Sequence, residues 1–134
     1  MSVAVPCVLF KPSVRLLATP ALARLLWAVQ QTVNRYGRSL TVSCGIENHT
    51  TGAHVTGEAI DLSVSGLTPM EMVDTCDHLV ALLGPLFYAQ LEAPDSMSDI
   101  MYPPFHARLQ VNPVATALHI HLQRRAGTVY PPPA

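Results

Sequence analysis

Hydrophobic side chains recur every three or four residues between Thr19 and Gly37, which is the spacing of one face of an α-helix. Thr19 is suited to cap this helix, Pro20 suits its first turn, and Gly37 is a stop signal. The apolar face consists of Leu22, Leu25, Leu26, Val29 and Val33, and Trp27 is expected in the core beside it.

A second helix is predicted to follow Thr68. The run Thr68-Pro69-Met70-Glu71 has the form of a capping box with proline in the first turn. Gly84 and Pro85 end the pattern. Its apolar face consists of Met72, Cys76, Leu79, Val80 and Leu83.

Four segments show the period of two that is typical of β-strands, at 39–46, 58–64, 87–92 and 118–123. In the first, Leu40, Val42 and Cys44 alternate with polar residues. In the second, Ile60, Leu62 and Val64 face one side, whereas Ala59, Asp61 and Ser63 face the other. Residues 93–116, with four prolines, are expected to form a long loop.

The order helix, strand, strand, helix, strand, strand predicts an α+β fold, with a small mixed or antiparallel sheet and helices on one face. A chain of 134 residues has room for one domain. We place this domain at 18–126, between an N-terminal arm at 1–17 and a proline-rich tail at 127–134.

Composition narrows the class of protein. The net charge is −1, and no basic cluster exceeds Arg124-Arg125, so we expect no nucleic-acid partner. No apolar run reaches the roughly 18 residues that span a bilayer. The apolar N-terminal stretch precedes the first positive charge, so we expect no signal peptide and synthesis in the cytoplasm. Cys7, Cys44 and Cys76 form no CxxC pair, and we expect them to be buried and reduced.

The segment His54-Val-Thr-Gly57-Glu-Ala59-Ile-Asp61 carries the first candidate chemistry. Imidazole nitrogen and carboxylate oxygen both bind zinc. Gly57 supplies a permissive backbone for the turn between the two ligands, and Ala59 leaves space beside the metal. Asp61 lies in an apolar run, where an unpaired carboxylate is costly.

His119 and His121 form the second candidate motif, because a spacing of two puts both imidazoles on one strand face. If that strand neighbours the strand of Asp61, then His54, Asp61 and His121 can converge on one zinc ion with a fourth position open for water. A single histidine on a strand is more often a satisfied polar residue, but the joint pattern favours a metal site. The remaining alternative is that no metal binds and both histidines are simply exposed.

The pattern H-x-x-G-x-A-x-D followed by H-x-H resembles the zinc peptidases of the M15 class, which include D-Ala-D-Ala carboxypeptidases and endolysins, and the related hedgehog signalling domain. The resemblance spans roughly residues 18–125. It implies His54, Asp61 and His121 as the zinc ligands. It also implies that His119 stabilises the oxyanion or carries a proton.

Two functions follow from the resemblance. The first is a zinc metallopeptidase that hydrolyses peptide bonds in bacterial peptidoglycan, as a carboxypeptidase or an endopeptidase. The alternative is a non-catalytic zinc-binding module, for example a component of a phage virion. It is favoured by two departures from the family, since no arginine lies in Cys44–Glu47 and Leu118 stands where many members have an acidic base.

Other residues are weaker candidates for the reaction. Glu92 ends a predicted strand and would point into the cleft as a catalytic carboxylate. His49, Tyr102 and His106 are candidate substrate-binding residues. The remaining acidic candidates for a base are Glu58, Asp95 and Asp99.

The expected partners are peptidoglycan stem peptides or another peptide substrate. The small size and the absence of a wall-binding segment suggest a phage-encoded protein that is associated with the virion or released at lysis. The N-terminal arm and the proline-rich tail would suit packing into a larger assembly.

Overall fold

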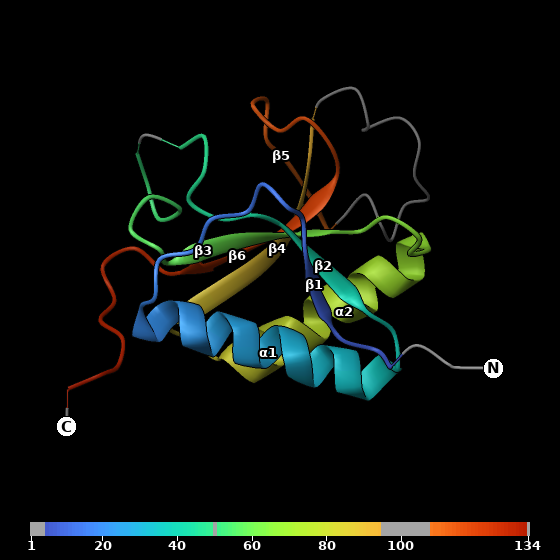
Figure 1. Cartoon of the computed structure of the whole chain (residues 1–134), viewed down its shortest axis with the longest axis horizontal. Helices are drawn as coiled ribbons and strands as arrows, with labels where there is room; N and C mark the ends of the chain where they lie inside the picture. The colour runs from blue at the N-terminus through green and yellow to red at the C-terminus, as the bar shows by residue number, and fades with distance from the viewer. Residues whose placement is uncertain (1–4, 50, 95–107, 134) are drawn as a thin grey trace.

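Two α-helices lie against one face of a six-stranded mixed sheet in the computed structural model, which describes residues 5–49, 51–94 and 108–133 (Figure 1). This is the α+β fold that the sequence predicts. The elements in chain order are β1 (Val8–Phe10), α1 (Pro20–Tyr36), β2 (Leu40–Cys44), β3 (Ala59–Ser63), α2 (Pro69–Leu83), β4 (Phe87–Ala93), β5 (Leu109–Val111) and β6 (His119–Arg124).

The strands are arranged in the order β1-β2-β3-β6-β4-β5. The four central strands pair in antiparallel fashion, while the short edge strands β1 and β5 pair in parallel with β2 and β4. Strand β6 therefore lies between β3 and β4. Its register places His121 opposite Asp61 and His119 opposite Glu92, which brings both sequence motifs to the centre of the sheet.

Both helices begin and end where the sequence predicts. The side chain of Thr19 accepts a hydrogen bond from the backbone N–H of Leu22, and Gly37 ends α1 in the left-handed conformation with φ of 66°. The capping box between Thr68 and Glu71 is formed at the start of α2. Local signals thus determine these boundaries.

The hydrophobic core lies between the sheet and the helices. On β3 and β6, alternate residues such as Ile60, Leu62, Ile120 and Leu122 are fully buried against the helices. Burying each such side chain contributes about 1.5–3 kcal/mol. The strand alternation directs the intervening side chains to the opposite face. Figure 1 shows both helices on one side of the sheet, so they do not cover that face.

The predicted burial of two helix residues, Trp27 and Val80, is wrong. The side chain of Trp27 is 41% exposed and that of Val80 is 44% exposed. Trp27 is two positions after Leu25, so it projects about 200° further around the helix. The guanidinium group of Arg24 covers its ring at 4.3 Å from the centroid.

The predicted loop at 93–116 is also corrected. Strand β4 continues through Ala93, and Leu109–Val111 form β5 beside it. A three-residue edge strand gives too short an alternation to be recognised in the sequence.

Both segments that flank the predicted domain contact it. Strand β1 pairs with β2, and the ring of Tyr130 packs on that of Phe87 with centroids 5.0 Å apart. Among the described residues, no helix is long and apolar enough to cross a membrane.

Candidate metal centre

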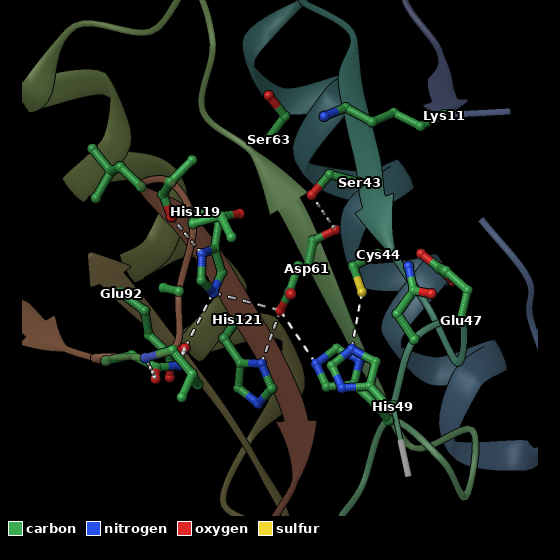
Figure 2. Close-up of a pocket in the computed structure, with 18 of the residues that line it drawn as sticks. Lys11, Ser43, Cys44, Glu47, His49, Asp61, Ser63, Glu92, His119 and His121 are labelled. Atoms are coloured by element: carbon green, nitrogen blue, oxygen red, sulfur yellow. Dashed lines mark hydrogen bonds and ion pairs between the residues drawn. The ribbon is translucent and has the colours of Figure 1, made fainter. Parts of the chain in front are cut away.

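The open face of the sheet carries a polar cleft with a volume of about 680 Å³ (Figure 2). Its floor is formed by polar side chains of β2, β3, β6 and β4, and the segments around residues 47–49 and 112–118 form its walls. This volume lies in the range of sites that bind small molecules and short peptides. Four histidines and the side chains of Glu47, Asp61 and Glu92 line it, so the cleft is the candidate functional site.

Asp61 lies at the centre of this cluster. The strand alternation directs its side chain away from the core, and its side chain is 15% exposed. Its Oδ1 atom lies 2.9 Å from Nδ1 of His121 and 3.4 Å from Nε2 of His54. Burial opposes ionisation, but the hydrogen bonds with these two histidines hold the pKa of the carboxyl far below its usual range. Asp61 is therefore an anion that needs a positive partner.

His54 reaches the cluster from a tight turn before β3. Gly57 has φ of 76°, and a Cβ atom there would lie 2.8 Å from Cβ of Leu17, so this position requires glycine. The hydroxyl of Thr19 donates to the carbonyl of Gly57 at 2.9 Å and ties the turn to the start of α1. Nδ1 of His54 donates to the carbonyl of Gly45 at 3.0 Å, which leaves Nε2 directed at Asp61.

His121 is held in a similar way by a partner on its own strand. Its Nε2 donates to Oε1 of Gln123 at 2.9 Å, while Nδ1 is directed at Asp61. The outer nitrogens of His54 and His121 are thus both bound to acceptors, which fixes the orientation of both rings. The two inner nitrogens and Oδ1 of Asp61 would face one another with lone pairs unless a proton or a metal ion lies between them.

The same three residues fit a zinc ion by ligand type and by spacing. Zinc binds imidazole nitrogen and carboxylate oxygen at about 2.0–2.1 Å, so two ligand atoms of a tetrahedral site lie roughly 3.3 Å apart. The distances of 2.9 and 3.4 Å from Asp61 to the two histidines are close to this value. His54, Asp61 and His121 form one of the groups whose ligand atoms all lie within 4.8 Å of one another.

His119 and Glu92 form a second pair on the same face. Nδ1 of His119 donates to the carbonyl of Ala117 at 2.9 Å, and Nε2 donates to Oε1 of Glu92 at 3.1 Å. Burial alone would lower the pKa of His119, but the hydrogen bond to Glu92 and the charge of Asp61 raise it. His119 is therefore held as a proton donor in the cleft.

Glu92 is kept ionised by three hydrogen bonds. Its carboxylate accepts from His119, from the amide of Gln90 and from the amide of Asn112. Burial opposes ionisation, but these bonds lower the pKa of Glu92 to about 2. Glu92, His119 and His121 are close enough to form an alternative group of metal ligands.

Cys44 lies at the edge of the cleft and not in the core as its alternation with Leu40 and Val42 predicts. A β-bulge between Val42 and Cys44 shifts the register, so that Cys44 pairs with Asp61 and shares its face. Burial and the charge of Asp61 raise the pKa of the Cys44 thiol to about 12. Of the other cysteines, Cys76 is buried but Cys7 is exposed, so the expectation that all three are buried is wrong; all three are free thiols.

The structure brings together most of the residues that the sequence singles out, although they come from three strands and from the connection between β2 and β3. His49, His54, Asp61, Glu92, His119 and His121 all line the cleft. Glu58 does not, because its carboxylate pairs with the guanidinium of Arg124. Asp95, Asp99, Tyr102 and His106 lie outside the described residues.

Two contributors to the site are missed by sequence reasoning. Gln123 follows His119 and His121 at the same spacing of two, so the alternation could have identified it as a partner on the same face. Cys44 gives no such signal, because a bulge cannot be recognised in this strand from the pattern of residue types.

Comparisons with known proteins found no match to a family model, to a curated protein or to a solved structure. The resemblance to M15-class peptidases therefore depends on the two motifs alone.

Proposed function

We propose that this protein is a zinc-dependent peptidase of the M15 kind that hydrolyses peptide bonds in bacterial peptidoglycan. The observation that carries the proposal is the convergence of His54 Nε2 and His121 Nδ1 on one oxygen of Asp61, with both outer nitrogens already bound. Three such ligands on an open cleft are typical of catalytic zinc sites, whereas structural sites are closed by four protein ligands.

The bound zinc would polarise the scissile carbonyl and lower the pKa of water. The residues around it have separate tasks. His54, Asp61 and His121 hold the ion, and Gly45 and Gln123 orient the two imidazoles through their outer nitrogens. Asp61 also balances part of the charge of the ion from within a largely buried position.

His119 is positioned to donate a proton or a hydrogen bond to the oxygen that becomes negatively charged. Its Nε2 lies 3.7 Å from Oδ1 of Asp61, so it is next to the proposed zinc ligands without being bound as one. Positioned donors of this kind stabilise the charge that develops in the transition state.

Glu92 would accept the proton of the attacking water. With a pKa of about 2, its carboxylate is a weak base while His119 donates to it. When His119 turns its N–H toward the substrate, Glu92 loses that donor and becomes more basic. Glu92 and His119 thus act as a coupled pair.

The shape and polarity of the cleft support a peptide as the substrate. The cleft extends beyond the proposed ligands toward the hydroxyl groups of Ser43 and Ser63 and toward Lys11 (Figure 2). Ser13 also lines it. Lys11 is the only lysine of the chain, and it places a positive charge near one end of a cleft that is otherwise acidic. Within this lining, the Lys11 end would bind a carboxylate group of a peptide, and the serine hydroxyls would bind its polar backbone.

The test is digestion of purified peptidoglycan by the zinc-loaded protein, followed by analysis of the released peptides. The wild type should release products, and His119→Gln should lower the rate by about 10²–10⁴-fold while it retains zinc. Tyr36→Phe is a suitable control, because Tyr36 lies on α1 outside the cleft.

The second function, a zinc-binding module without hydrolysis, is the other outcome of this experiment. Zinc retention without release of peptides, by a protein tested on several wall types and on free stem peptides, would refute the peptidase. The metal site would then serve stability or assembly.

A further inference from the structure

Three ligand-bearing side chains form a second group at the edge of the cleft, next to the proposed zinc site. Sγ of Cys44 lies 3.1 Å from Nε2 of His49, and the ring of His49 stacks on that of His54 at 4.1 Å between centroids and 3° between planes. The ligand atoms of Cys44, His49 and His54 all lie within 4.8 Å of one another. Figure 2 shows Cys44 directed toward His49 and not toward the core.

Several features of the backbone produce this arrangement. The bulge in β2 turns Cys44 to the cleft face, and the left-handed conformation of Asn48, with φ of 62°, precedes His49. The carboxylate of Glu47 accepts the backbone N–H groups of Gly45 and Arg15 at 2.9 and 3.0 Å, which holds the segment between Cys44 and His49 in place. The loop between Cys44 and His49 therefore preorganises these two side chains.

We propose that Cys44, His49 and His54 form a second metal position, which takes a thiophilic divalent cation such as zinc, cobalt or cadmium. Sulfur and imidazole ligands together favour such ions over magnesium or calcium. Asp61, which pairs with Cys44 across the strands, adds a negative charge beside the position. On binding, the cation takes the place of the Cys44 thiol proton, which is released to solvent.

The two positions share His54. Because Nδ1 of His54 donates to the carbonyl of Gly45, only Nε2 is free, and one nitrogen can bind one ion. When the first position is filled, a second ion is left with Cys44, His49 and water. The first equivalent should therefore enter the position of Asp61 and His121, and the second should bind more weakly at Cys44. This order rests on the proposed function, but the existence of the Cys44 position does not.

Cobalt is a suitable probe, because a cobalt–thiolate bond gives a charge-transfer absorption in the near ultraviolet. Titration of the reduced, metal-free protein with Co²⁺ should show this band in the wild type, mainly with the second equivalent. Cys44→Ser should lose the band. Cys7→Ser should keep it, because Cys7 is exposed and lies outside the cleft.

His49→Gln is a second variant, which leaves the thiol in place. It should need a higher cobalt concentration to reach the same absorption. His121→Phe separates the two proposals: it removes the first position but leaves Cys44, His49 and His54, so the thiolate band should appear with the first equivalent.

The proposal is overturned if excess cobalt gives no thiolate band in the wild type, or if the band persists in Cys44→Ser. A band that is present in the wild type but still needs two equivalents in His121→Phe would instead contradict the assignment of the first position. The two failures are thus distinguishable.

Discussion

Asp61 and His121 lie directly opposite each other on the antiparallel strands β3 and β6, with Oδ1 of Asp61 2.9 Å from Nδ1 of His121. The two residues are 60 positions apart in the chain. Their pairing is produced by the register of the two strands, which also buries Ile60 and Leu122 on the other face. A slip of either strand by one residue would turn its own ligand into the core and separate it from the other, so the register that forms the core also forms the site.

Zinc should stabilise the folded protein, because its three ligands are brought together only in the folded state. At a free zinc concentration about 100 times the Kd, the gain is about 2.7 kcal/mol, which should raise the Tm by roughly 10 °C. Thermal unfolding with and without zinc measures this shift. It should be absent in Asp61→Asn and preserved in Glu58→Gln, whose carboxylate pairs with Arg124 outside the cleft. An equal shift in both variants would exclude Asp61 as a ligand.

Gln123 should set the zinc affinity through His121. Gln123→Leu removes the acceptor of the outer N–H of His121 and should weaken zinc binding by about 10–100-fold. Tyr88→Phe should have a smaller effect, because the Tyr88 hydroxyl only donates to the Gln123 oxygen, at 2.8 Å. Competition with a chelator of known affinity measures the zinc affinity of both variants. Unchanged affinity in Gln123→Leu would mean that Gln123 does not orient His121 for metal binding.

Glu92→Gln distinguishes a catalytic carboxylate from a ligand. If the ion is held by Asp61, this variant should retain zinc and lose peptidase activity by about 10²–10⁴-fold. If the ion lies instead among Glu92, His119 and His121, the variant should lose zinc while Asp61→Asn keeps it. Metal analysis together with the activity assay separates the two arrangements.

Gly57→Ala should be more destabilising than Gly66→Ala. Both glycines have positive φ, 76° and 84°, so each substitution strains the backbone by about 1–2 kcal/mol. Only at Gly57 would the new Cβ also approach Leu17, at 2.8 Å, which should cost about 1–3 kcal/mol more. Chemical denaturation measures the free energy of unfolding of each variant, and hence the difference between them. Equal destabilisation would show that the turn before β3 can shift without cost.

The fold and much of the site follow from local sequence signals. Helix boundaries are predicted by Thr19, Gly37 and Thr68, because capping depends on a few neighbouring residues. The period of two in β3 and β6 predicts which side chains leave the core, and hence that Asp61 and His121 share a face.

The features that are missed depend on long-range pairing. The bulge that turns Cys44 into the cleft exists only against β3, and β5 is too short to show an alternation of its own. Glu92 meets His119 because β6 is inserted between β3 and β4, an order that the sequence pattern does not encode locally. Pairing of this kind is decided by the whole sheet.

The most direct test of the central claim is the zinc content of the purified protein after dialysis, measured by plasma mass spectrometry for the wild type and for Asp61→Ala. The account predicts about one tightly held zinc per chain in the wild type and none in the variant, since Asp61 lies between the two histidine ligands. Absence of metal from both proteins, even after refolding with zinc, would contradict it.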